Sequence, residues 1–270
     1  MNVLFETRFS FFGQSGWKSA HAADPDLLFA ADRLEARLKL FEKITLKSLS
    51  GQTDGKFRIL VLSSTLMPQP YQTRLNELCQ DVLGKDRARV IFRPEGSAGH
   101  IFRNTVGRVY GDKQVAQVVL DDDDAVSVDF VEMLRKYARM AQSDPYNEKP
   151  YTFVSFPRGH TLGLENGAIK WLSPRYVPYT NLGLALVGPG NAKKNPFLTS
   201  HKKIGMRQPS FMVTHMRPYY LRAVHGLNDS NAHADDQHLN ADEIAKVIPY
   251  FPWLGAHFPH IRPASDLAAQ

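Results

Sequence analysis

The chain has 270 residues, of which 43% are hydrophobic and 22% are charged. These proportions are ordinary for a globular protein, and the length suits one large α/β domain or one domain with a C-terminal extension. Lys and Arg number 33 against 27 Asp and Glu, and the resulting net charge of +6 suits an anionic ligand or an acidic membrane surface. No basic run interleaved with aromatic residues is present, which argues against a nucleic-acid partner.

Cys79 is the only cysteine, so an intrachain disulfide is excluded, and its absence fits a reducing compartment. The first ten residues include Glu6 and Arg8 and lack the apolar centre of a signal peptide. No uncharged apolar stretch is long enough to cross a bilayer. We therefore expect a soluble, cytoplasmic protein, with peripheral attachment to the inner face of a membrane left open.

Strands and helices alternate through the first 150 residues. The helix predicted from residue 24 has an acidic N-cap, Asp24, followed by Pro25. This alternation predicts an α/β fold with a mostly parallel, Rossmann-like central sheet and flanking helices. The sequence predicts strands at 2–5, 57–63, 88–92 and 115–120, and helices at 24–49, 71–83, 97–110 and 128–140.

The pattern changes after Pro150. A strand at 151–156, a hairpin at 159–171 and a strand at 180–187 are expected, and the rest is rich in Pro, His and aromatic residues without clear helices. The sequence therefore predicts an α/β half, residues 1–150, and a smaller, irregular half, residues 151–270, within one continuous domain.

Four aspartates, Asp121 to Asp124, directly follow the apolar strand predicted at 115–120. Four adjacent carboxylates repel one another unless a cation lies nearby. No Gly, Pro, Ser or Asn comes first to form a solvated turn, which is the usual setting of a charge run. Carboxylates at the C-terminal end of a sheet strand suit a hard divalent cation, and we favour that interpretation.

The order of these motifs resembles that of the GT-A glycosyltransferases, the large inverting family in particular, in which an Arg-Asn helix, a strand and an Asp-x-Asp-Asp (DXD) turn follow one another. Here Arg103-Asn104 precedes Gly107 by one residue more than in that pattern. The whole chain is most similar to a group of bacterial putative rhamnosyltransferases. The segments that carry this similarity are Arg33-Leu34, 40–42, 48–49, 52–54, 120–124 and 224–230.

The resemblance implies an enzyme, a glycosyltransferase that moves a hexose, with rhamnose the suggested sugar. It would take the sugar from a nucleoside-diphosphate donor to a polysaccharide or lipid-linked acceptor, with inversion. It implies Mn²⁺ or Mg²⁺ at Asp123 and Asp124, with His225 as a further ligand, Asp121 nearer the ribose and Asp122 a solvated bystander. The cation would neutralise charge on the leaving diphosphate. Residues 1–150 would bind the nucleotide sugar, and residues 151–270 would face the acceptor.

Two arginines are predicted to lie near the donor. Arg8 follows the first strand, where folds of this kind bind nucleotides, and Arg103 lies on the helix before the acidic turn. A planar guanidinium suits phosphate recognition. For both residues an ordinary surface position or a salt bridge remains an equal alternative.

An inverting transferase needs a general base for the acceptor hydroxyl. The Glu-Asp pair that such enzymes use is missing from the expected region. We prefer Asp229 as the base. The other candidates are Asp235, Asp236, His201 and Glu165.

Two other functions remain open. A sugar-phosphate nucleotidyltransferase would carry a Gly-rich loop with a lysine after the first strand, and residues 13–18 resemble such a loop faintly. A non-catalytic carbohydrate-binding or Ca²⁺-binding module would also use an acidic turn.

Overall fold

The computed structural model describes residues 1–14, 20–165, 167–226 and 237–264. In the first 150 residues the strands are β1 (Asn2–Arg8), β2 (Arg58–Ser64), β3 (Ala88–Arg93), β4 (Gln114–Val119) and β5 (Ala125–Val126). The helices there are α1 (Ala20–Ala23), α2 (Pro25–Leu28), α3 (Ala31–Leu40), the π-helix η1 (Phe41–Leu46), α4 (Lys47–Ser50), α5 (Gln69–Leu83), α6 (Ala98–Tyr110) and α7 (Phe130–Gln142).

The second half contributes further strands and short helices. The strands are β6 (Thr152–Ser155), β7 (Arg158–Glu165), β8 (Ala168–Tyr176), β9 (Ala185–Pro189), β10 (Ser210–Met212) and β11 (Tyr220–Val224). The helices are α8 (Ile204–Arg207), α9 (Ala241–Val247) and the 3₁₀ turns η2 (Pro196–Leu198), η3 (His201–Lys203), η4 (Ile248–Tyr250) and η5 (Pro252–Ala256).

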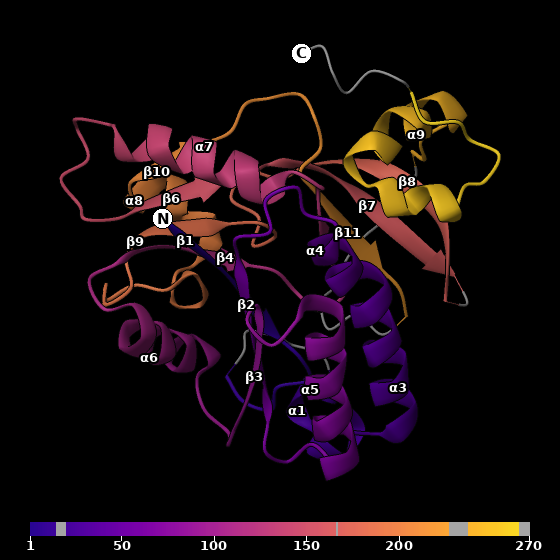
Figure 1. Ribbon diagram of the computed structural model, residues 1–270, viewed down its shortest axis with the longest axis horizontal. Coiled ribbons are helices and arrows are strands. Elements are labelled where there is room, and N and C mark those ends of the chain that lie inside the picture. Colours follow the sequence, from indigo (N-terminus) through magenta and orange to yellow (C-terminus); the bar gives the residue numbers. More distant parts are fainter. Residues whose placement is uncertain (15–19, 166, 227–236, 265–270) are drawn as a thin grey trace.

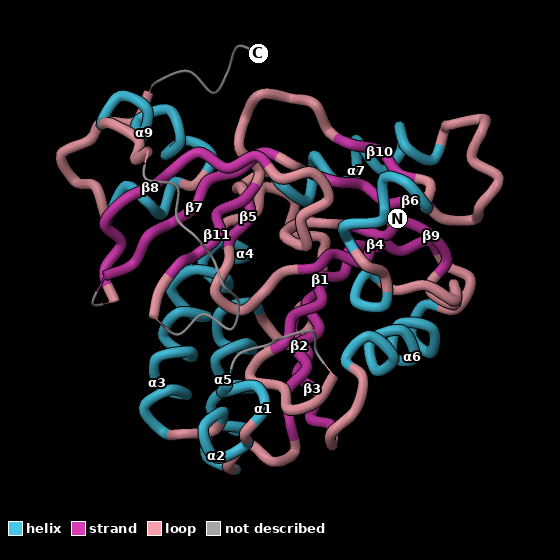
Figure 2. Tube along the Cα trace, turned by 180° about the vertical axis from the view of Figure 1, so that it is seen from behind, coloured by secondary structure: helices cyan, strands magenta, loops and turns pink. Residues whose placement is uncertain are grey.

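The main sheet has seven strands in the order β10-β6-β9-β4-β1-β2-β3. The pairs β3-β2, β2-β1, β1-β4 and β6-β10 are parallel, and β9 runs against both of its neighbours. Helices α3 and α5 lie on one side of this sheet and α6 on the other, as Figures 1 and 2 show. The predicted α/β fold class with a mostly parallel central sheet is confirmed.

A second sheet of four strands has the order β5-β11-β7-β8. The predicted hairpin forms β7 and β8, and helix α9 with η4 and η5 shares a buried apolar cluster with these strands. The described part of residues 151–264 is thus more regular than the sequence indicated, because its short strands complete both sheets. Within the described ranges, every helix is too short or too polar to cross a bilayer.

The predicted helix at 24–49 is interrupted. Asp24 caps α2 as expected, but α2 ends at Leu28 and α3 starts at Ala31. Arg33 stabilises the break because its Nη1 donates to the Leu28 carbonyl oxygen at 3.2 Å, which satisfies an end of α2. Arg33 and Arg37 on α3 are both buried.

Gly163 in β7 lies opposite Trp171 in β8, and a Cβ added to it would meet the indole ring at 1.9 Å. Gly163→Ala should therefore lower the free energy of unfolding by about 1–3 kcal/mol, measured by urea denaturation. Gly55→Ala is the control, because its Cβ would make only an ordinary contact. Equal stability of the two variants would show that the hairpin does not pack in this way.

Candidate functional site

The four aspartates follow β4 at its C-terminal end, beside the end of β1. Leu120 N–H still donates to the Glu6 carbonyl oxygen at 3.2 Å, so the chain leaves the sheet only at Asp121. Asp122, Asp123 and Asp124 are buried, whereas the Asp121 side chain is 31% exposed. Three neighbouring buried carboxylates need cationic or hydrogen-bonding partners, and two separate segments of the chain, α3 and the end of β11, supply them.

Arg37 on α3 supplies the central cation. Its side chain is 3% exposed, its Nη1 lies 3.0 Å from Asp123 Oδ2, and its Nε lies 3.3 Å from Asp122 Oδ2. Nη2 also contacts Asp122 Oδ1. The prediction that Asp122 is a solvated bystander is wrong, because its side chain is fully buried and bound in this fork.

Thr45 on the π-helix η1 holds the backbone of the acidic turn. Its hydroxyl donates to the Asp124 carbonyl oxygen at 2.8 Å and lies 3.3 Å from that of Asp121. Thr45 lies on the same continuous helical segment as Arg37. This segment therefore fixes both the side chains and the main chain of the turn, and its π-helical register is of a kind often found at functional sites.

Arg8 meets Asp121 at the open edge of the turn. Arg8 Nη2 donates to Asp121 Oδ1 at 2.7 Å, and the guanidinium lies 4.6 Å from the ring centroid of Phe197. Two residues predicted near the donor are thus paired with each other. Arg103 lies on α6 and donates to its neighbour Asn104 at 3.4 Å, and no hydrogen bond or ion pair within the described residues joins it to the aspartates.

Strand β11 brings the late histidine to the turn. β11 pairs with β5, so that Leu221 lies opposite Ala125 (Figure 2). The Ala223 N–H donates to Asp124 Oδ1 at 2.9 Å, and His225 Nε2 forms a 3.0 Å hydrogen bond with Asp123 Oδ2. The three predicted metal ligands therefore lie in one cluster.

The predicted general base, Asp229, lies outside the described residues, as do Asp235 and Asp236. Part of the faint Gly-rich loop, residues 15–18, also lies outside them. Glu165 is exposed at the end of β7, and His201 lies on η3. The assignment of the base therefore stays a prediction.

The pKa values of Asp123 and Asp124 are shifted in opposite directions. Burial raises the pKa of Asp123, but Arg37 together with His225 and Arg222 outweighs burial and lowers it to about 2. Burial and the neighbouring carboxylates of Asp123 and Asp121 raise the pKa of Asp124 well above its ordinary value. The turn therefore keeps negative charge at Asp123 and resists further charge at Asp124 unless a cation arrives.

A second buried polar cluster lies beneath Arg8. Asn195 Nδ2 donates to both Glu6 carboxyl oxygens, at 3.2 and 2.9 Å, and to Gln117 Oε1 at 3.0 Å. Asn195 Oδ1 accepts from the Phe197 N–H at 2.9 Å. The cluster thus ties β1 and β4 to the loop that places Phe197 against Arg8.

The carboxylate and imidazole groups of the turn are of the types that Mn²⁺ and Mg²⁺ accept. Asp121 and Asp124 each use Oδ1 in a described contact, and no hydrogen bond from a described residue reaches either Oδ2. Among the described residues, however, no three acidic, His or Cys side chains are spaced as a complete metal cage. The residues fit a cation that takes one or two carboxylates and completes its shell with phosphate and water oxygens.

Comparison with known proteins shows the family of this chain. The family described as "Putative rhamnosyl transferase" matches residues 2–237. The chain belongs to this family. The predicted similarity to putative rhamnosyltransferases is therefore confirmed. Comparison with curated proteins gave no significant match.

Solved structures show distant likenesses. TarS of S. aureus is 12% identical with a TM-score of 0.45, covering 83% of this chain and 37% of that one. TarS 1–349 in complex with UDP is 11% identical with a TM-score of 0.43, covering 83% and 61%. A glucose-1-phosphate thymidylyltransferase of Bacillus anthracis is 7% identical with a TM-score of 0.32, covering 79% and 87%. The chain thus spans less than two thirds of either TarS chain.

Sequence reasoning missed Arg37, Thr45 and Asn195. Arg33 and Arg37 are four residues apart, directly before Leu34 and Leu38, so they flank the apolar stripe of the helix. That spacing is a usable signal for buried arginines when an acidic run elsewhere needs cations. No comparable signal marks Asn195, which stands alone in a loop.

Arg37→Met should lower the free energy of unfolding by about 3–5 kcal/mol, because it leaves buried carboxylates without their cation. Arg74→Met is the control: Arg74 pairs with Glu35 at the surface, where the side chains are 47% and 39% exposed, and its loss should cost less than about 1 kcal/mol. Denaturant unfolding measures the loss of stability in both variants. The loss in Arg37→Lys should lie between the other two. Equal losses at Arg37 and Arg74 would contradict the buried pairing.

Burial raises the pKa of Glu6 to about 8, although the hydrogen bond from Asn195 lowers it in part. An unfolded chain releases this proton near pH 4.5, so the folded state binds more protons between pH 4.5 and 8 and loses stability as pH rises through that window. Glu6→Gln should remove this slope, which reaches about 1.4 kcal/mol per pH unit.

Urea denaturation between pH 5 and 8 measures the effect. Glu77→Gln, at an exposed glutamate on α5, serves as the control and should keep the wild-type slope. If Glu6→Gln and wild type show the same slope, Glu6 is not buried in its neutral form.

Proposed function

We propose that this protein transfers a hexose, with rhamnose the favoured sugar, from a nucleoside-diphosphate donor to a polysaccharide or lipid-linked acceptor. Membership of a rhamnosyl transferase family supports this activity. The observation that carries it is the meeting of Arg8, Asp121, Asp123, Asp124 and His225 at one end of the parallel strands. Open α/β sheets bind their ligands at that end.

Each group at the turn has a proposed part. Arg8 would bind the diphosphate through its guanidinium, and Asp121, its partner at 2.7 Å, would lie toward the ribose. Asp123 and Asp124, with His225, would hold Mn²⁺ or Mg²⁺, which when bound neutralises charge on the leaving diphosphate. Arg37 and Thr45 would keep the carboxylates in place, so that little reorganisation is needed on binding.

Inversion is proposed on the strength of the resemblance. It requires a base that takes the acceptor hydroxyl proton as the sugar carbon is attacked, and Asp229 is the proposed group. A nucleoside-diphosphate leaving group needs charge stabilisation rather than a proton, which fits a turn whose cationic partners are arginines.

Asp124→Asn should lower turnover of the nucleotide-sugar donor by at least about 100-fold, because it removes a proposed ligand of the cation that would neutralise charge on the leaving diphosphate. Asp81→Asn, at an exposed aspartate on α5, is the matched control and should retain wild-type turnover. UDP-, dTDP- and GDP-sugars with Mn²⁺ form the panel, and thermal unfolding checks that both variants fold. Turnover within about twofold of wild type in a folded Asp124→Asn protein would overturn the assignment.

The same purified protein can be assayed for the alternative activity, that of a sugar-phosphate nucleotidyltransferase. Release of pyrophosphate from a nucleoside triphosphate and a sugar phosphate would identify a nucleotidyltransferase, whereas the proposed function predicts none.

A further inference from the structure

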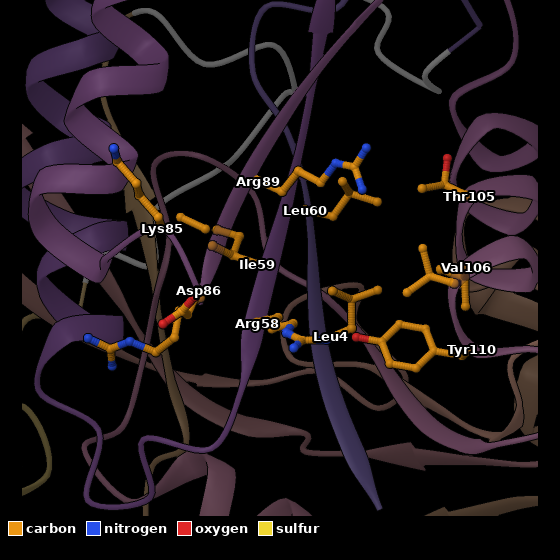
Figure 3. A pocket seen from close by; sticks show the side chains of 13 residues that line it. Leu4, Arg58, Ile59, Leu60, Lys85, Asp86, Arg89, Thr105, Val106 and Tyr110 are labelled. Carbon is orange, nitrogen blue, oxygen red and sulfur yellow. The ribbon is translucent and has the colours of Figure 1, made fainter.

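A basic groove lies at the opposite end of the main sheet from the acidic turn. It has a volume of about 180 Å³ and lies between α6 and the strands β2 and β3 (Figure 3). Leu4 and Leu60 of the sheet and Val106 and Tyr110 of α6 form its apolar floor. None of the residues of the proposed transfer site lines it.

Strand register places the side chains of two arginines on the face of the main sheet that forms the floor of the groove. Leu60 of β2 lies opposite Arg89 of β3, and Arg58 lies two residues before Leu60, so all three side chains point to the α6 face. Figure 3 shows Arg89 beside Leu60 and Arg58 beside Leu4, with Lys85 and Asp86 across the strands from Val106 and Tyr110. β3 is the edge strand of the sheet, so this end of the groove is open.

The charge of the groove is strongly one-sided. Arg58, Lys85, Arg87 and Arg89 line it together with a single acid, Asp86. Within the described residues, no ion pair joins any of these four cations to a carboxylate. Arg87 is held locally, because its Nε donates to the Leu83 carbonyl oxygen at 2.7 Å. The other three are exposed.

The surface next to the groove also combines exposed cations with apolar side chains. An adjoining hollow shares Arg58, Asp86, Arg87 and Tyr110 with the groove and adds the exposed Lys56. Val109 on α6 is 49% exposed at the groove. Exposed cations on long side chains beside apolar surface suit mobile anionic head groups better than a tightly held soluble anion, which needs buried, convergent donors.

We propose that this groove binds the anionic head groups of a membrane leaflet and so attaches the protein peripherally to a bilayer. The acidic turn then faces away from the membrane, because it lies at the other end of the same strands. The proposal does not depend on the transfer reaction, since the groove and the acidic turn share no residue.

Vesicle sedimentation at about 0.1 M salt tests the attachment. The full chain should sediment with vesicles of phosphatidylglycerol and phosphatidylcholine in equal parts and not with phosphatidylcholine alone. The variant Arg58→Gln/Lys85→Gln/Arg89→Gln should bind roughly 100-fold more weakly, about fivefold for each cation. Its turnover of donor in solution should equal that of wild type.

A control variant removes the same charge elsewhere. Arg139→Gln/Lys149→Gln/Arg262→Gln changes three exposed cations outside the groove and should bind within a few fold of wild type. Equal weakening by both variants would overturn the proposal in favour of diffuse charge. Loss of vesicle binding to millimolar glycerol phosphate would overturn it in favour of a soluble-anion site, and no sedimentation of wild type would overturn it outright.

Discussion

The buried guanidinium of Arg37 is the interaction on which the acidic turn depends. Asp122 and Asp123 are buried side by side, and carboxylates in that position either lose their charge or need a cation within reach. Arg37 reaches both, and Thr45 on the same helical segment fixes the main chain on either side of them, at Asp121 and Asp124. The segment from α3 to α4 therefore belongs to the site as much as the strands do, because without it the turn would have to open to water.

The remaining groups of the turn are arranged around that pair. Asp121 stands at the exposed edge with Arg8, while Asp124 is held by the Ala223 N–H of the second sheet. The two sheets are thus joined at the turn, through β5 and β11, and this contact carries His225 to Asp123. Such an arrangement is preorganised, in the sense that its dipoles and charges already face one another before any donor binds.

Much of this fold follows from patterns in the sequence, and the reasons for the exceptions are physical. Buried strands such as β2 are continuous apolar runs, so their positions could be predicted. The fold brings Arg8 to Asp121 and His225 to Asp123, and the roles of these residues stay predictions. For Arg37 the helical spacing can indicate burial but not which carboxylates it meets. Asn195 could not be predicted, because a polar residue is buried only when a distant partner meets it, and periodicity carries no information about partners.

Binding of Mn²⁺ followed by electron paramagnetic resonance tests the proposed donor site most directly. Since Arg37 and His225 already occupy Asp123 Oδ2, the protein should bind Mn²⁺ weakly alone and more tightly once a nucleoside diphosphate supplies further oxygens. UDP, dTDP or GDP should increase the bound fraction of Mn²⁺ in the wild type and not in Asp124→Asn. Mn²⁺ binding that is absent with every nucleotide, or unchanged in the variant, would contradict the proposed donor site.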